Sequence, residues 1–267
     1  MNLDELKQRR WFYEFELPDG TKTICDAGES VAKLHATRRT MLHAFLDAFE
    51  PAKPGKYSAR GFAVDVACHQ GYFAFELMRR GYAVCGFDIN RESIADARLM
   101  AKVFGFEAPD AAFIEKDVRD WSVRQHGEAE IVLCFGLLYH CEDSVTVLRK
   151  AALAAQRAII VETLVAPTPK KFAGRDIEQV TWGIPPATRP TQGWFALVEE
   201  DANRESGSTN LALVPTEAAV HAMLRACGFN TRKLEPPADG HESMLTHLQR
   251  GTGAVGPSRV MIVGERK

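Results

Sequence analysis

The sequence predicts an α/β fold, in which a mostly parallel sheet is covered by helices on both faces, and two observations support this class. Short apolar strands alternate with amphipathic helices between residues 62 and 165, which is the order that crossover helices between parallel strands require. The first unit, Phe62–Asn90, is a strand, a turn, a helix and a second strand that ends at the acid Asp88. An acid in this place commonly binds ribose hydroxyls. We therefore expect a Rossmann-like sheet that binds a nucleoside.

The turn after the first strand indicates which kind of nucleoside. Residues 65–71 read DVACHQG, and only the last position of a D-x-G-x-G-x-G pattern is glycine. A dinucleotide site needs the other glycines because the backbone has to approach a pyrophosphate. Ala67 is a mild change, whereas His69 places a bulky side chain where the pyrophosphate would lie. The turn therefore argues against NAD or FAD and favours a cofactor without phosphate, whose amino-acid tail lies beside the turn.

This turn and the acid that ends the second strand resemble the first two motifs of class I S-adenosylmethionine (SAM)-dependent methyltransferases. The step from Asp65 to Asp88 is 88 − 65 = 23 residues, close to the ~20 residues expected after such a turn. The resemblance implies a seven-stranded methyltransferase sheet, with SAM as the cofactor and S-adenosyl-L-homocysteine (SAH) as its product. The residues that it places at SAM in this unit are Asp65, Ala67, His69, Gly71, Asp88 and Ile89.

Composition limits the class of protein further. A chain of 267 residues, 46% hydrophobic and 25% charged, is typical of a globular protein with one large α/β domain and additions, or with two small domains. No apolar run reaches the ~20 residues that span a bilayer, and the first residues have no apolar core, so we expect a cytoplasmic protein. No C-x-x-C pair is present, and we expect no metal. The net charge of −2 does not indicate the basic surface that nucleic-acid binding requires.

Residues 1–56 are expected to form an N-terminal extension, ahead of a methyltransferase domain over residues 57–267. Trp11–Thr23 alternates aromatic and acidic residues and contains the turn sequence Pro-Asp-Gly, which predicts a hairpin. Ser30–Phe49 has apolar residues at helical spacing, with two arginines at positions 38 and 39. The extension either packs over the mouth of the cofactor site or is a plain structural cap.

The next units follow the same order of strand and helix. Ile94–Phe104 is expected to be a helix and Ala111–Glu115 the third strand. By the resemblance, an acid just after this strand receives the adenine amino group, which would be Asp117, with Val118 beside it and Asp120 as the alternative. Either acid could instead cap a short turn or helix.

The fourth strand, Glu130–Gly136, leads into the presumed site, because ligands of such sheets bind beyond the carboxyl ends of the strands. Phe135 and Tyr139 offer aromatic faces that suit a sulfonium cation. His140 could act as a general base towards an acceptor hydroxyl, or could be a structural histidine bonded to a loop carbonyl.

The fifth strand, Arg157–Val165, contains an acid, Glu162, which is unusual in an apolar strand and could orient the substrate or pair with a basic group. Before it, Asp143 or Ser144 is expected to cap a helix. Residues 166–214 form an insert, long for a plain connection, in which Trp182 and Trp194 could cover the acceptor. The insert could equally be a surface subdomain.

The last third of the domain should complete the sheet. Thr216 is placed to cap a helix that ends at Gly228. Residues 238–257 read as a polar loop between the strands Asn230–Leu234 and Val260–Gly264. Two late strands joined without a helix fit the antiparallel pair that ends a methyltransferase sheet.

Three segments resemble one branch of these enzymes, the tRNA wobble-uridine carboxymethyl/methoxyuridine methyltransferases: WFYEFELPDGTKT at 11–23, FGLLYHCED at 135–143 and VETLV at 161–165. By this resemblance Tyr139 lies by the sulfonium and carboxylate end of the donor. A tRNA enzyme should show a basic face, yet the basic clusters are short, so a small-molecule acceptor is favoured and tRNA is the alternative. The sequence shows no clearly placed cation that would bind the extra carboxylate of a carboxylated SAM, so ordinary SAM is expected as the donor. A homodimer, a non-catalytic SAM-binding protein and an NAD-dependent oxidoreductase remain as alternatives.

Overall fold

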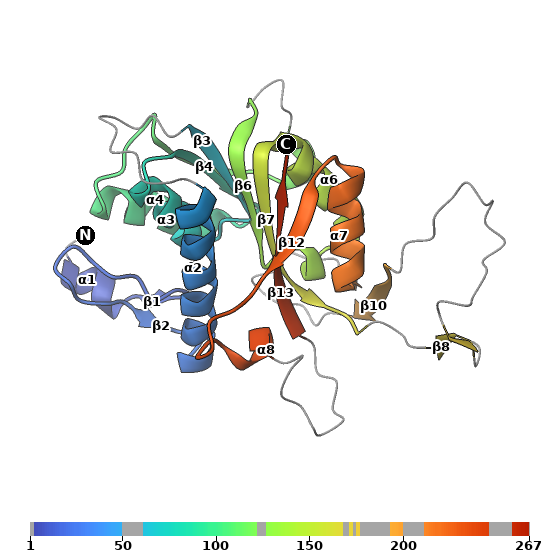
Figure 1. The fold of residues 1–267 in the computed structure, drawn as a ribbon. Coiled ribbons are helices and arrows are strands. Elements are labelled where there is room, and N and C mark those ends of the chain that lie inside the picture. Colours follow the sequence, from blue (N-terminus) through green and yellow to red (C-terminus); the bar gives the residue numbers. More distant parts are fainter. Residues whose placement is uncertain are drawn as a thin grey trace.

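The computed structural model of the protein shows a central sheet with helices on both sides (Figure 1). The residues that it describes are 3–49, 61–121, 127–167, 171–172, 175–176, 193–199, 211–245 and 258–266.

The sheet has seven strands in the order β12-β13-β7-β6-β3-β4-β5. Their bounds are β3 Phe62–Val66, β4 Ala83–Asp88, β5 Ala111–Glu115, β6 Ala129–Phe135, β7 Ala155–Val165, β12 Asn230–Leu234 and β13 Ser258–Glu265. All neighbouring pairs are parallel except those of β13, which runs antiparallel to both β7 and β12. The seven-stranded sheet and its antiparallel final pair, both expected from the sequence, are confirmed.

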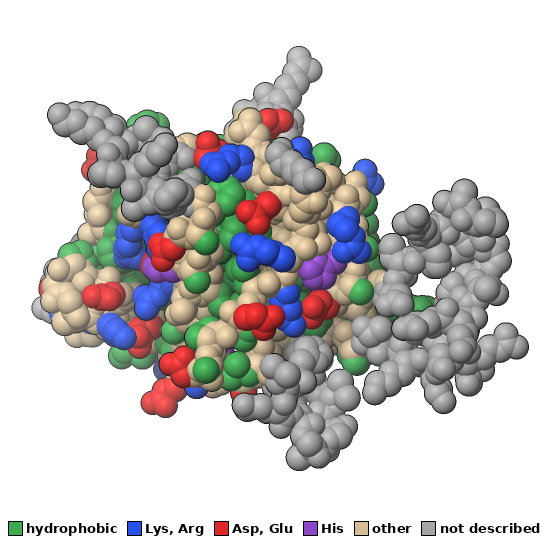
Figure 2. Space-filling model, viewed as in Figure 1, with side chains coloured by type: hydrophobic (Ala, Val, Ile, Leu, Met, Phe, Trp, Pro, Cys, Tyr) green, Lys and Arg blue, Asp and Glu red, His purple; other side chains and the backbone are tan. Residues whose placement is uncertain are grey.

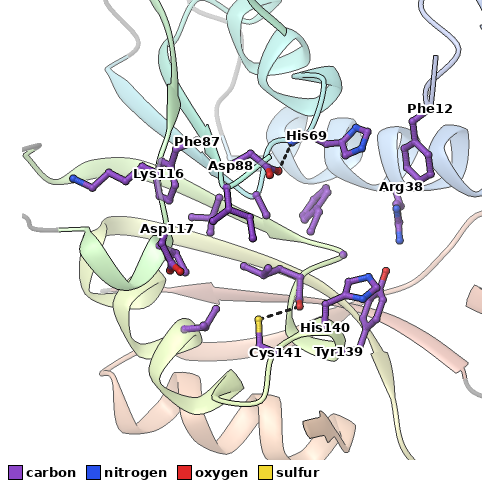
Figure 3. Close-up of a pocket in the computed structure, with 18 of the residues that line it drawn as sticks. Phe12, Arg38, His69, Phe87, Asp88, Lys116, Asp117, Tyr139, His140 and Cys141 are labelled. Carbon is purple, nitrogen blue, oxygen red and sulfur yellow. Dashed lines mark hydrogen bonds between the residues drawn. The ribbon is translucent and has the colours of Figure 1, made fainter. Parts of the chain in front are cut away.

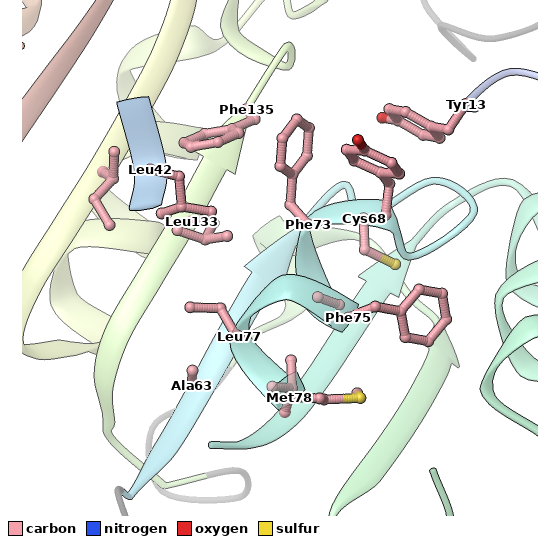
Figure 4. Close-up of a cluster of buried hydrophobic side chains, with 14 of the residues drawn as sticks. Tyr13, Leu42, Ala63, Cys68, Phe73, Phe75, Leu77, Met78, Leu133 and Phe135 are labelled. Carbon is pink, nitrogen blue, oxygen red and sulfur yellow. The ribbon is translucent and has the colours of Figure 1, made fainter. Parts of the chain in front are cut away.

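The two faces of the sheet pack against different helices. The helices are α3 Tyr72–Arg79, α4 Arg91–Val103, α6 Ser144–Ala154 and α7 Glu217–Ala226, together with the N-terminal α2 Glu29–Phe49. Alternate strand residues explain the two layers, since Ile131 and Leu133 of β6 pack with α2, α3 and α4, whereas Val132 between them packs with α6 and α7. Figure 4 shows the first of these clusters, where Phe73 and Leu77 of α3 lie against Leu133.

Helix ends form where the sequence places capping residues. The Asp143 side chain accepts a hydrogen bond from the backbone N–H of Thr146 at 3.2 Å, and Thr216 Oγ1 accepts one from Ala219 at 3.3 Å. The expected caps of α6 and α7 are therefore confirmed, with Asp143 rather than Ser144 at α6.

The N-terminal part consists of α1 Leu3–Gln8, β1 Arg10–Trp11, β2 Ile24–Cys25 and α2. The expected turn lies between residues 17 and 21, where Leu17 N–H donates to Thr21 O at 2.7 Å, and Glu16 bridges to Lys22 in antiparallel fashion. Phe12 N–H donates to Gln70 Oε1 at 2.9 Å. This bond connects the N-terminal part directly to the turn between β3 and α3.

Parts of the segment between β7 and α7 are described. They are β8 Lys171–Phe172, β9 Arg175–Asp176, β10 Phe195–Glu199 and β11 Leu211–Pro215, of which β10 and β11 form an antiparallel pair. Leu213 N–H donates to Cys141 O at 2.9 Å, so β11 contacts the segment after β6. The expectation of a polar loop over 238–257 is wrong for residues 242–245, since α8 Glu242–Leu245 forms there around the buried Met244, and residues 246–257 lie outside the described residues. None of the helices in the described parts of the chain has the length and apolar character to cross a bilayer.

Candidate functional site

A cavity of about 380 Å³ opens at the carboxyl ends of β3, β4 and β6, the edge where open parallel sheets bind ligands (Figure 3). The cavity has two ends in Figure 3, one at Asp88, Lys116 and Asp117, and one at Phe12, Arg38 and Tyr139. Nine of the residues predicted for the site line it. They are Ala67, His69, Asp88, Ile89, Asp117, Val118, Phe135, Tyr139 and His140.

The turn after β3 keeps the shape of a glycine turn although two of its glycines are missing. Ala67 and His69 have φ values of 55° and 50°, in the left-handed region that glycine adopts freely and other residues adopt at a cost of about 1–2 kcal/mol. Gly71, with φ of 81°, could not carry a side chain, since a Cβ there would lie 2.9 Å from Cε1 of Phe113. The turn therefore keeps the left-handed backbone of a glycine turn at these positions.

Asp88 joins this turn to the end of β4. Its Oδ2 accepts a hydrogen bond from His69 N–H at 2.9 Å, and its Oδ1 accepts one from Asn90 N–H at 2.8 Å. The side chain is buried, and burial raises the pKa of Asp88 while the backbone N–H groups act in the opposite direction. The Ile89 backbone N–H acts on the same carboxylate, and since a carboxylate has about four acceptor positions, acceptor capacity remains for a hydroxyl donor in the cavity. This donor requirement matches a ribose diol.

Asp117 lines the cavity but is already engaged. It caps the short 3₁₀ helix η1 Val118–Asp120, accepting from Arg119 N–H at 2.7 Å, and it forms an ion pair with the Arg119 guanidinium at 2.5 Å. Hydrogen bonding from Arg119 lowers the pKa of Asp117. The capping role that the sequence left open is thus present, and contact with adenine stays a prediction. Asp120, the alternative acid, is not among the lining residues.

The segment after β6 supplies aromatic walls. Tyr139 and His140 lie in the 3₁₀ helix η2 Leu138–His140, with their ring centroids 4.2 Å apart. Phe135 packs edge-on against Phe73 at 4.8 Å. Both His140 and Tyr139 face the cavity, as expected from their place at a strand end.

A buried ionic cluster forms one wall of the second end. Glu162, fully buried in β7, lies 2.7 Å from Nη2 of Arg38 and accepts a hydrogen bond from Nη1 of Arg259 at 3.1 Å. Arg259 Nη2 also donates to the Tyr139 hydroxyl at 3.1 Å. Glu162 does not line the cavity, whereas both arginines do. Of the two roles left open for Glu162, the structure therefore shows pairing with basic groups.

The sequence analysis did not predict the two arginines of this cluster as site residues, and it also missed His35. This histidine lies in α2 one turn before Arg38, is 2% exposed, and lines the cavity. Its ring packs on Tyr13 and Phe12, with centroid distances of 4.4 Å and 5.0 Å. Burial, with help from the Arg38 charge, lowers the pKa of His35 to about 2, so the imidazole is neutral.

A helical pattern could have found both α2 residues, because His35 and Arg38 share the face of Leu34, Met41 and Leu42, which is the buried face. The sequence reasoning instead treated Arg38 as an ordinary basic residue of an amphipathic helix. Arg259 could have been noticed in a similar way, because it lies at the start of the otherwise apolar strand β13.

Besides Glu162, four predicted residues do not line the cavity or cannot be placed. Asp65 lies beneath the turn, where burial raises its pKa to about 8 although a hydrogen bond from Ala74 N–H acts against this. Gly71 belongs to the turn but packs against Phe113 and does not line the cavity. Trp194 donates its backbone N–H to Thr216 Oγ1 at 3.0 Å and is not a lining residue. Trp182 lies outside the described residues. Within the described ranges, no three His, Cys, Asp or Glu side chains are grouped to hold a metal ion.

Known proteins share this architecture. Residues 63–156 match the family model described as "Methyltransferase domain". Among curated proteins, the ubiquinone biosynthesis O-methyltransferase of Vibrio campbellii is 29% identical over 89 residues, which are 33% of this chain and 37% of that protein. The corresponding protein of Escherichia coli K12 is 28% identical over 89 residues, 33% of this chain and 36% of that protein. The chain thus spans little more than a third of the length of these relatives.

Solved structures resemble the fold over nearly the whole chain. The N-terminal domain of EvdMO1, determined with SAH bound, has a TM-score of 0.65 and 19% identity, covering 99% of this chain and 94% of that one. The magnesium protoporphyrin IX methyltransferase of Synechocystis PCC 6803, with SAM bound, has a TM-score of 0.56 and 16% identity, covering 93% and 87%. At these identities the likeness concerns the fold.

Residues 63–156 thus match a methyltransferase domain, and the sheet order and the cavity at its carboxyl edge agree with the fold of solved structures that hold SAM or SAH. The class and the cofactor expected from the sequence are therefore confirmed. The more specific resemblance to the tRNA wobble-uridine branch has no counterpart among these findings.

Proposed function

We propose that this chain transfers the sulfonium methyl group of SAM to a small-molecule acceptor by direct displacement. The observation that carries the proposal is Asp88. Its buried carboxylate holds the turn after β3 by one hydrogen bond and keeps acceptor capacity towards a cavity of about 380 Å³. That volume is within the usual range of small-molecule sites, roughly 300–1,000 Å³.

When bound, SAM supplies a methyl group that is already activated for displacement. The residues of this chain then have to bind, align and exclude water, which accounts for most of the rate of such reactions. Asp88 would hold the ribose, and Asp117 with Val118 would border the adenine. Phe135 and Tyr139 would flank the reacting centre.

If the acceptor is a hydroxyl, its proton has to leave as the new bond forms. His140 lines the cavity beside Tyr139 and would take that proton. The electron pair of the acceptor oxygen then forms the new C–O bond, and the pair of the broken C–S bond stays on sulfur. His140 rather than His35 suits this step, since the low pKa of His35 makes it a poor base.

Charge and size favour a small acceptor over tRNA. The chain carries a net charge of −2. On the face seen in Figure 2, acidic and basic side chains are interspersed without a continuous basic surface, which phosphate-backbone binding would need. The curated relatives named above are O-methyltransferases of ubiquinone biosynthesis, which supports a small acceptor. A tRNA acceptor is the alternative.

We further propose that residues 57–267 form the methyltransferase domain and residues 1–56 an extension that completes its cavity. Phe12, Tyr13 and His35 of the extension line the cavity, which supports a role in acceptor binding rather than that of a plain cap. Residues 166–214 are proposed as an insert on the substrate side.

The test is incubation of the protein with SAM labelled at the methyl group, against fractionated metabolites and against tRNA. Label in the metabolite fraction is expected. Label in tRNA alone would support the alternative. SAH binding without transfer to any fraction would indicate a non-catalytic SAM-binding protein. Protection from heat by nicotinamide cofactor and not by SAM would indicate an oxidoreductase.

A further inference from the structure

The second end of the cavity is defined here as the α2 subsite, formed by His35, Arg38, Tyr139 and Arg259. We propose that the α2 subsite binds a carboxylate of the methyl acceptor, with the two arginines as its cationic contacts and His35 as a further hydrogen-bond donor. This inference rests on the proposed function and names the chemical class of its acceptor.

Charge is unbalanced at this subsite. Two guanidinium groups, of Arg38 and Arg259, face the single carboxylate of Glu162, and their side chains are only 6% and 14% exposed. The excess is therefore one buried positive charge among the described residues of this wall. Buried charges in proteins are normally paired, since removal from water costs several kcal/mol per ion. An anionic group of a ligand would complete the pairing.

Of the four acids that line the cavity, two lie at its other end in Figure 3, and Asp143 caps α6. Asp88 ends β4, and Asp117 follows β5 and is paired with Arg119. Glu142 acts on the same Arg119. The groups that act on the charge of Arg259 are Glu162 and Tyr139. The cavity thus has an acidic end, suited to ribose hydroxyls, and a basic end.

Several hydrogen-bonding groups in the α2 subsite also lack partners. Within the described parts of the chain, neither ring nitrogen of His35 has a hydrogen-bond partner, and Nε of Arg38 has none. His35 is only 2% exposed, so bulk solvent does not provide hydrogen bonds to its ring nitrogens. The neutral imidazole has one N–H to donate, and the guanidinium groups donate further N–H bonds. A cluster of donors with excess positive charge is the environment that a carboxylate requires.

The location of these residues favours the acceptor over the cofactor as the source of that carboxylate. The segment that matches the methyltransferase domain covers residues 63–156 and contains Asp88, Asp117 and the turn after β3. Residues His35 and Arg38 lie before this segment, and Arg259 lies after it. A cofactor common to many methyltransferases is bound by what they share, whereas acceptors differ, so residues outside the shared segment are the ones expected to select the acceptor.

The walls beside the subsite indicate what the carboxylate is attached to. Phe12 and Tyr13 line the cavity next to His35, and Tyr139 lies opposite, with Arg259 4.9 Å from its ring centroid. Aromatic walls bind flat rings well. The acceptor class is therefore a small aromatic carboxylic acid.

The probe pair is 3,4-dihydroxybenzoate and 3,4-dihydroxybenzamide, which differ only in the charged group. Each is titrated by calorimetry into the full chain saturated with SAH. We expect the acid to bind at least about tenfold more tightly than the amide, the effect of one charge-assisted hydrogen bond. Equal affinities in the wild-type protein would overturn the inference and leave the proposed function standing, since the binding of SAH is measured beforehand, when the protein is saturated by titration. Absence of SAH binding would overturn the proposed function itself.

Two variants and a matched control locate the effect. Arg38→Gln should reduce the preference for the acid to less than about threefold and leave the Kd of SAH within about twofold. His35→Phe, which keeps the ring packing against Tyr13, should weaken acid binding about three- to tenfold and so tests the subsite without removing an ion pair. Arg39→Gln removes the adjacent charge, which does not line this cavity, and should change neither value. A parallel loss of SAH affinity in Arg38→Gln would overturn the inference, because the carboxylate at Arg38 would then be the cofactor's own.

Discussion

Replacing Glu162 by glutamine tests the buried ionic cluster that supports the α2 subsite. Glu162 is fully buried between Arg38 and Arg259, at 2.7 Å and 3.1 Å from their nitrogens. The amide keeps the shape but removes the charge, and two guanidinium groups are left without a counter-ion. Removing one partner of a buried ion pair costs about 3–5 kcal/mol, so we expect the free energy of unfolding to fall by that amount.

The assay is urea unfolding at pH 7, followed by fluorescence and circular dichroism, with the free energy taken from the linear dependence on urea. The matched control is Glu130→Gln on β6, where the carboxylate pairs with Arg157 at 3.3 Å and both side chains are partly exposed. That pair should contribute less than about 1 kcal/mol. A loss below about 1 kcal/mol for Glu162→Gln would refute the reasoning, since the arginine charges would then be compensated elsewhere.

Three further predictions concern the turn and the proposed base. Gly71→Ala should lower the free energy of unfolding by about 2–4 kcal/mol, because its Cβ would meet Phe113 at 2.9 Å in a left-handed backbone; a loss under 1 kcal/mol by urea unfolding would contradict this. Burial lowers the pKa of His69 to about 4, so the unfolded chain binds the extra proton between pH 6.5 and 4 and stability falls as pH falls through that window. His69→Asn, which tolerates the left-handed backbone, should reduce this slope by up to ~1 kcal/mol per pH unit in unfolding curves from pH 4 to 7.5, and an unchanged slope would show that His69 does not contribute. His140→Ala should slow turnover about 100-fold with the Kd of SAM nearly unchanged, whereas unchanged turnover would make His140 structural.

The sequence predicted the sheet and one end of the cavity well because local patterns determine both. Buried parallel strands read as short apolar runs, and the site of such a sheet follows from where the strands end. Asp88, Tyr139 and His140 could therefore be placed at the cavity edge from their positions alone. The caps Asp143 and Thr216 were equally local, since each depends on the three residues that follow it.

The α2 subsite could not be predicted in the same way. The contact between Glu162 and Arg259 spans 97 residues, and nothing in the periodicity of α2 states which strand its buried face meets. Most arginines are exposed to solvent, whereas Arg38 is buried, and the sequence of α2 does not distinguish it from its neighbour. Asp117 shows a second limit of the sequence. An acid that caps a short helix and an acid that binds a ligand occupy the same position after a strand, so the sequence cannot distinguish the two roles.

The most direct test of the account is the affinity of SAH for Asp88→Asn, measured by titration calorimetry beside the wild-type protein. The substitution keeps the shape of the side chain and removes its charge, so we predict that the Kd rises about 10- to 100-fold, as expected when a charged acceptor of hydroxyl donors is lost. Asp110→Asn, an exposed acid just before β5 that does not line the cavity, is the matched control and should bind SAH as the wild type does. An Asp88→Asn protein that is folded and binds SAH with wild-type affinity would contradict the central claim that this carboxylate holds the cofactor.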